Sequence, residues 1–369
     1  LYAGTENGMY ISYNDGASWD AFQNNLPIVP ITDLAVKDHS LIVATQGRSL
    51  WMIDDLTVLH QLLAGEKTNP KTARLFDPKD AYRTKGRGGR ASLTAGTNLP
   101  NGVITHFYIP EGMEQDSVVL NYHNAAGETL ATYSNKAKAK NETLTLTAGA
   151  NTFVWDTRGT GSELLPGMIM WWANLDGAKA VPGAYKVSMS VGDQTMAIHD
   201  FNIMPDPRAE ASVADMQTQY EFITAVNTTI NDAHDAIKNI RDVNAKLSAF
   251  MKKYKGDASV SDLFTMAQDM KASLETVEKA LYQTQNRSGQ DPLNFPIRLT
   301  NKLGHLNSLV GLDDFAPTEQ DEVVRQELTA AIDLQLASFN QTISDQLEAF
   351  NAAFTAKGLP FLSVADDKE

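Results

Sequence analysis

The chain contains no cysteine among its 369 residues. This absence excludes disulfide bridges, zinc sites with thiolate ligands and cysteine nucleophiles. No apolar run approaches the roughly 18 residues that a membrane-spanning helix needs, so we expect no membrane span. The seven histidines are scattered, with no His-x-His or His-x-x-x-His pair, and we therefore expect no zinc site or other bound metal.

Positive charge is also scarce, because 31 lysine and arginine residues face 45 aspartate and glutamate residues. The net charge of −14 would repel phosphate groups, so we expect no nucleic-acid partner, and anionic membrane surfaces are disfavoured. The sequence has no P-loop, no dinucleotide fingerprint and no Gly-x-Ser-x-Gly nucleophile motif. We therefore predict no cofactor and assign no catalytic residue.

The sequence does contain enough apolar residues for more than one core. Hydrophobic residues make up 43% of the chain, and its length predicts two or three domains. The residue pattern divides it into a strand-rich region at 1–63, a second β region at 72–204 and a helical region at 208–358. We therefore predict a multidomain α and β protein.

Region 1–63 consists of short apolar runs separated by turn residues. These runs predict strands at 1–4, 9–13, 18–22, 31–37, 41–46, 50–53 and 58–62. A β-propeller blade has four strands, so the seven runs amount to one complete blade and part of another. A propeller needs about four to eight blades, and this region cannot close a ring alone.

The second region predicts an antiparallel β-sandwich, with strands at 103–109, 117–123, 129–133, 142–147, 151–155, 184–191 and 196–203. From Ser212 onward the apolar period changes from two residues to about 3.5, which predicts helices at about 212–254, 259–285, 299–310 and 318–354. At roughly 1.5 Å per residue, the two middle helices laid end to end match each outer helix in length. We therefore expect a long antiparallel α-helical bundle with an interrupted middle strand.

One hairpin carries a recognisable motif. Its sequence follows the Asp-box pattern Ser-x-[Asp/Asn]-x-Gly-x-[Ser/Thr]-Trp, with the members Ser12, Asn14, Asp15, Gly16, Ser18 and Trp19. An Asp box closes the hairpin between the outer strands of a propeller blade. The side-chain oxygens of Asn14 and Asp15 are of the kind that ligate a cation, but Asx-turn hydrogen bonds would give them a structural role. We favour the structural role.

The Asp box and residues 44–56 resemble the C-terminal blades of BNR/Asp-box propeller proteins, a glycosyl-hydrolase-like family related to sialidase and sortilin (VPS10) propellers. Residues 153–158, 182–187 and 205–208 resemble the Ig-like domain that follows such propellers. Residues 295–310 and 316–318 resemble the helical tail of a large bacterial group. The resemblance implies partial β-propeller blades, an Ig-like antiparallel β-sandwich and a helical bundle. It also implies that the chain begins inside a blade of a longer protein, which we expect to be periplasmic or secreted.

The resemblance does not carry a catalytic site with it. Sialidases draw three arginines, a Tyr–Glu pair and an Asp acid from several blades, and this chain cannot assemble that set. We therefore expect a non-catalytic portion that braces the missing N-terminal propeller and offers a surface to a carbohydrate or protein partner. Two alternatives remain open: a glycoside hydrolase whose active site lies in the missing blades, and a carbohydrate-binding module.

The candidates for ligand binding are Arg48, Trp155, Trp171 and Trp172. Arg48 would reach the propeller channel from a turn, or would simply be a turn residue. The tryptophans, with Tyr122 and Tyr133, would stack on sugar rings. Core packing and an interdomain contact are the competing interpretations for these aromatic residues.

Two sets of charged residues are weaker candidates for a functional site. Asp54 and Asp55 are adjacent carboxylates, but neighbouring strand residues point to opposite faces, so we expect turn capping rather than an acid–base pair. The basic run consists of Lys79, Arg83, Lys85, Arg87 and Arg90. Its interleaved glycines could cradle a phosphate, but the spacing matches no phosphate loop, and we expect a surface loop.

Overall fold

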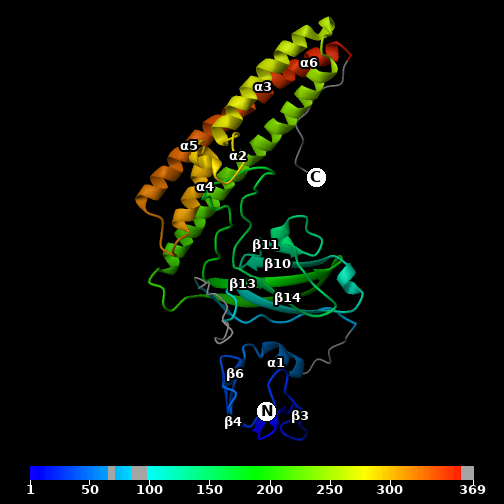
Figure 1. Ribbon diagram of the computed structural model, residues 1–369, viewed down its shortest axis with the longest axis vertical. Coiled ribbons are helices and arrows are strands. Elements are labelled where there is room, and N and C mark those ends of the chain that lie inside the picture. Colours follow the sequence, from blue (N-terminus) through cyan, green and yellow to red (C-terminus); the bar gives the residue numbers. More distant parts are fainter. Residues whose placement is uncertain (65–70, 85–97, 359–369) are drawn as a thin grey trace. The chain divides into compact units, whose positions relative to one another are not determined.

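The computed structural model describes residues 1–64, 71–84 and 98–358, and the chain divides into two compact units (Figure 1). The first unit comprises residues 1–157 and 182–207, and the second comprises residues 158–181 and 208–369. The predicted mixture of helices and small sheets is confirmed. Residues 158–181, which we call the excursion, leave the first unit between two strands and belong with the helices. The predicted β region at 72–204 is therefore divided between the two units.

The first 64 residues form two small antiparallel sheets. One consists of β1 (Tyr2–Thr5), β2 (Gly8–Ile11) and β3 (Asp20–Ala21), and the other of β4 (Ile31–Lys37), β5 (Ser40–Thr45) and β6 (Leu50–Ile53). Each sheet has three strands. Between them lies a small core of five buried side chains: Met9, Leu26, Leu41, Val43 and Leu56.

The strand predicted at 58–62 is wrong, because these residues belong to helix α1 (Thr57–Leu63). Val58, Leu59, Leu62 and Leu63 have the spacing of one helix face, and Leu59 packs against the small core. The Asp55 carboxylate accepts a hydrogen bond from the backbone N–H of Thr57 at 2.8 Å, at the start of the helix. A short apolar run is compatible with either a strand or a helix, so the pattern alone did not decide between them.

The rest of the first unit contains two further sheets. Its strands are β7 (Arg74–Leu75), β8 (Ala81–Arg83), β9 (Val103–Ile109), β10 (Val118–Asn124), β11 (Thr129–Ser134), β12 (Gly149–Trp155), β13 (Gly183–Val191) and β14 (Gln194–Pro205). One sheet has the order β11-β10-β13-β14-β8, in which only β14 and β8 run parallel, and the other has the order β12-β9-β7. The short strands β7 and β8 were not predicted.

The strand predicted at 142–147 is also wrong. Short 3-10 turns occur at Met113–Gln115, Lys140–Glu142, Ala258–Val260 and Asp291–Leu293. The second of these turns occupies the start of the predicted strand, and Thr143 makes a single bridge to Ser134. The hydroxyl of Thr143 donates to the carbonyl of Ala139 at 3.0 Å, so its local polar contacts close a turn.

An aromatic core joins the five-stranded sheet to the β12-β9-β7 sheet. The Tyr122 ring of β10 stacks on the Trp155 ring of β12, with 4.5 Å between ring centroids, and both side chains are fully buried. The Tyr122 hydroxyl and the Thr105 hydroxyl of β9 form a hydrogen bond of 2.8 Å. Burial raises the pKa of Tyr122 above its usual range. The buried phenol therefore remains neutral and hydrogen-bonded inside the core.

The second unit contains α2 (Val213–Lys253), α3 (Ser261–Leu281), α4 (Leu299–Val310), α5 (Glu319–Thr342), a π-helical turn at Ile343–Leu347 and α6 (Glu348–Ala356). Ser212 with Asp215 and Thr318 with Asp321 form the capping boxes that begin α2 and α5. Both α2 and α5 contact α3 and α4, which follow each other along them (Figure 1). None of the helices in the described part of the chain is both long and apolar enough to cross a bilayer.

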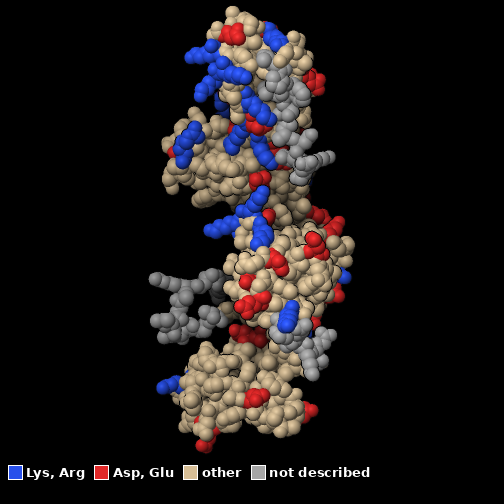
Figure 2. Space-filling view, turned by 90° about the vertical axis from the view of Figure 1, so that its right-hand side faces the viewer, with Lys and Arg blue, Asp and Glu red and all other residues tan. Residues whose placement is uncertain are grey.

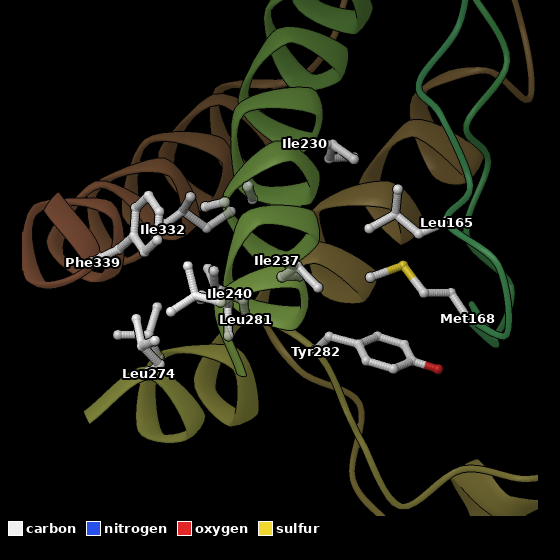
Figure 3. Packing of buried hydrophobic residues seen from close by; sticks show 14 of the residues in the cluster. Leu165, Met168, Ile230, Ile237, Ile240, Leu274, Leu281, Tyr282, Ile332 and Phe339 are labelled. Atoms are coloured by element: carbon white, nitrogen blue, oxygen red, sulfur yellow. The ribbon is translucent and has the colours of Figure 1, made fainter. Parts of the chain in front are cut away.

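The excursion is part of the helical core. Its Leu165, Met168 and Ala178 are buried in the same cluster as the apolar faces of the helices, and Figure 3 shows Leu165 and Met168 beside Ile237 of α2. The two arms of the excursion are held together by hydrogen bonds from Gly159 N–H to the Ala178 carbonyl, 3.0 Å, and from Ser162 N–H to the Leu175 carbonyl, 2.7 Å. The arms approach so closely that a Cβ atom on Gly177 would lie 1.9 Å from the Gly159 carbonyl oxygen.

Candidate assembly surface

The Asp-box hairpin is tied together by its own side chains. The Ser12 hydroxyl accepts from the Gly16 N–H at 2.8 Å, and the Asn14 side-chain oxygen accepts from the Ser18 N–H at 2.8 Å. The Asn14 amide also donates to the Ser18 hydroxyl at 2.8 Å. Asp15 and Gly16 have φ angles of 54° and 91°, the left-handed conformation that such a tight turn requires. The polar atoms of Ser12 and Asn14 therefore serve the hairpin backbone.

Two further features of the Asp box are the environment of Trp19 and the arrangement of the nearby acidic side chains. Trp19 is exposed rather than packed beneath the hairpin. Within residues 1–64, 71–84 and 98–358, no group of three His, Asp or Glu side chains is arranged to hold a metal ion.

The four candidate ligand residues are divided between the two units, and only the rings of Trp171 and Trp172, 5.5 Å apart between centroids, are in contact among those in the second unit. Arg48 is exposed in the turn between β5 and β6, where its carbonyl accepts from the Trp51 indole N–H at 2.9 Å. Trp155 is fully buried in the first unit, so its ring has no free face for a sugar. Trp171 and Trp172 lie in the excursion, which belongs to the second unit. Trp172 is 71% exposed and its ring stacks on that of His305, with 6.4 Å between centroids.

The adjacent carboxylates have separate surroundings. Asp55 lies 3.6 Å from the His106 ring nitrogen of β9 and also accepts from the Thr57 N–H, whereas Asp54 accepts a hydrogen bond from the Ser40 hydroxyl through its backbone carbonyl. Burial alone would raise the pKa of Asp55, but hydrogen bonds from His106 and Thr57 outweigh it and lower this pKa to about 2. Asp55 is therefore a structural anion.

The basic run does not form a described site. The Lys79 ammonium donates to the Asp38 carbonyl at 2.6 Å, and Arg83 is buried in β8. Lys85, Arg87 and Arg90 lie outside the described residues. Lys79 and Asp55 line a cleft of about 760 Å³ in the first unit, together with three other aspartates.

The most unusual surface is the outer face of the β4–β5–β6 sheet. Strand register places Ala35, Ile42 and Met52 in one cross-strand row of this face, and Asp33, Ala44 and Leu50 in the next. Five of these six residues are apolar. The inner face carries Leu34, Val43 and Trp51 in its own row and packs on the small core. Both faces of the sheet are therefore apolar.

This outer face is open in the structure of the chain. Leu50 is 71% exposed and Met52 is 55% exposed. Nine of the 21 large apolar side chains that are exposed in the described residues belong to residues 1–64. The same residues hold nine of the chain's charged side chains, and Figure 2 shows a mostly uncharged surface there. Two of the nine, Leu50 and Met52, lie in neighbouring rows of the outer face, and an exposed apolar patch of this kind is typical of a surface that another protein element covers.

Sequence reasoning missed this face, although a signal was present. An antiparallel strand with one solvated face alternates apolar and polar residues, whereas residues 50–53 are apolar throughout. A continuous apolar run of this kind predicts burial on both sides of a strand.

Comparison with known proteins does not extend these observations. No protein-family model matches the chain, and no significant match is found among curated proteins.

Proposed function

We propose that this chain is the non-catalytic C-terminal portion of a larger periplasmic or secreted BNR/Asp-box propeller protein. In this proposal residues 1–63 complete the propeller, the facing sheets of the first unit form an Ig-like brace, and the helices offer an assembly surface. The missing N-terminal propeller of the same protein is the partner of residues 1–63.

The observation that carries the proposal is the open apolar face formed by Ala35, Ile42, Ala44, Leu50 and Met52. Propeller blades pack face to face, so the sheet at the end of an incomplete propeller would present an apolar outer face to the next blade. Burying a leucine or methionine side chain contributes about 1.5–3 kcal/mol, so covering Leu50 and Met52 would help to stabilise such a contact.

Two further features support the proposal. The Ser12 and Asn14 hydrogen bonds support the structural role that the family resemblance implies for the Asp-box hairpin. The full burial of Trp155 also favours a packing role for this ring over the stacking of a sugar.

The intact mass of the naturally produced protein tests this proposal. We expect a polypeptide much larger than the 40.3 kDa of these residues, with additional strand-rich sequence before Leu1. Peptide mapping across Leu1 is the control, because it would show that the extra mass is joined to this chain. A natural protein of 40.3 kDa would contradict the proposal.

A further inference from the structure

His234 of α2 holds the excursion by its backbone. The ring Nδ1 lies 2.6 Å from the carbonyl oxygen of Glu163, and the side chain is almost fully buried. A carbonyl oxygen only accepts hydrogen bonds, so Nδ1 must carry a proton and donate it. The other ring nitrogen, Nε2, is buried without a hydrogen-bond partner in the described part of the chain. The contact is therefore built for the neutral imidazole.

Three other polar contacts of the excursion come from side chains that keep one charge state near neutral pH. The Glu163 N–H donates to the Asn231 side chain at 3.1 Å, and the Ile169 N–H donates to the Tyr282 hydroxyl at 2.8 Å. The Asn301 side chain binds both the N–H and the carbonyl of Trp171, each at 2.8 Å. Histidine is the side chain that ordinarily changes charge between pH 5 and pH 8.

Protonation of His234 would place a second N–H, on the buried Nε2, where the described residues offer no hydrogen-bond partner. Burial lowers the pKa of His234, whereas the carbonyl and carboxylate of Glu163 and the carboxylate of Asp235 act in the opposite direction. Arg241 of α2 adds to the lowering, and its guanidinium is itself paired with Glu278 of α3 at 2.7 Å. A second histidine, His305 of α4, contacts the excursion, because its ring stacks on that of Trp172.

We propose that His234 is a pH-sensitive latch, and that protonation of its buried Nε2 releases the excursion from the helices. The direction of the pH effect follows from the different pKa of His234 in the released and latched states. The released state protonates near the ordinary histidine pKa of about 6.5, whereas the latched state resists protonation. The latch is therefore closed above about pH 6.5 and weakens as the pH falls through the lowered pKa.

Hydrogen–deuterium exchange of this chain at pH 7.5 and pH 5.5, corrected for intrinsic exchange rates, tests the latch. We expect protection of the amides of residues 163–173 to fall roughly tenfold at the lower pH, whereas the buried amides in the middle of α2 keep theirs. In the variant His234→Asn, which retains a donor near the Nδ1 position but cannot become charged, protection should change less than about twofold.

The matched control is His305→Asn, which removes the other histidine that contacts the excursion. This variant should lose protection at pH 5.5 as the parent chain does. His234→Gln provides a second uncharged variant in case His234→Asn disturbs the packing of α2. Equal protection of the parent chain at both pH values would overturn the proposal. An acid-induced loss that persists in both His234 variants would overturn it as well.

Discussion

The helical unit and residues 1–64 use apolar side chains in opposite ways. The helical unit gathers thirty buried apolar residues into one cluster, including three side chains of the excursion. Residues 1–64 bury only five apolar residues in their cluster and leave large ones such as Leu50 and Met52 on the surface. Both regions are rich in apolar residues, but residues 1–64 leave a larger share of them exposed than the helical unit does.

The difference indicates what each region needs in order to be stable. The helical unit has three sources for its core, which are the long helices, the interrupted middle pair and the excursion. The β4–β5–β6 sheet has a core on one side only and is joined to the rest of its unit by polar contacts, such as the Asp55–His106 pair. A small core rarely suffices for a region of about 60 residues, so a partner on the outer face would complete it.

The largest expected effect tests whether the excursion belongs to the helical core. Gly177→Ala would force a Cβ atom to within 1.9 Å of the Gly159 carbonyl and separate the two arms. We expect the free energy of unfolding of the second unit to fall by more than about 4 kcal/mol in urea titrations. Gly289→Ala is the control, because nothing lies within 4 Å of the added Cβ. Equal effects of the two variants would contradict an integral excursion.

The second test compares the two faces of the β4–β5–β6 sheet with the same substitution. Leu41 is fully buried on the inner face, and Leu41→Ala should lower the stability of the first unit by about 2–4 kcal/mol. Leu50 is exposed on the outer face, and Leu50→Ala should change the stability of the first unit by less than about 0.5 kcal/mol in the isolated chain. A large loss in Leu50→Ala, measured by chemical denaturation, would show that the outer face is already covered.

The third test concerns the polar attachment of residues 1–64. The pKa of Asp55 is lowered from 3.8 to about 2, so its contribution is present above the unfolded pKa and is lost as pH falls through about 2. Asp55→Asn should therefore cost about 2 kcal/mol at pH 7, and this difference should shrink between pH 4 and pH 2. The neighbouring variant Asp54→Asn should have little effect. A loss of stability in Asp55→Asn that stays the same between pH 7 and pH 2 would argue against a stabilising role of the ionised Asp55 carboxylate.

The smallest effect is expected at the turn between β4 and β5. Asp38 and His39 have φ angles of 50° and 63°, which suit a two-residue hairpin turn but strain residues with a side chain. Replacing them together by Asn and Gly, the residues this turn favours, should stabilise the first unit by about 1 kcal/mol. Thermal unfolding measures the change, and a lower melting temperature would mean that the native side chains stabilise the turn.

The elements that the sequence predicts well are those with a sustained period. The apolar stripe from Met216 to Leu247 predicts α2, and its capping box at Ser212 is present in the structure. The strand at 103–109 has the predicted bounds. The helix at 57–63 was missed because its apolar run is too short to establish a period.

For the excursion, the sequence left an interdomain contact of its tryptophans open as one interpretation, but it did not identify the helices as the partner. Residues 158–181 have no regular period, and they are held largely by side chains such as Asn301 and His234 that bind backbone atoms. Backbone groups are the same in every residue, so no sequence pattern marks which segment such side chains will bind. The outer sheet face was predictable in principle, from the continuous apolar run at 50–53.

The central claim is that another sheet covers the outer face of β4–β5–β6 in the natural protein. Hydroxyl-radical oxidation of Met52 measures this directly, because its side chain is 55% exposed in the isolated chain. Met196 of β14, which is partly exposed in the first unit, is the internal reference. We predict that Met52 is oxidised at least about tenfold more slowly, relative to Met196, in the natural protein than in this chain. Equal relative rates in the two samples would contradict the account.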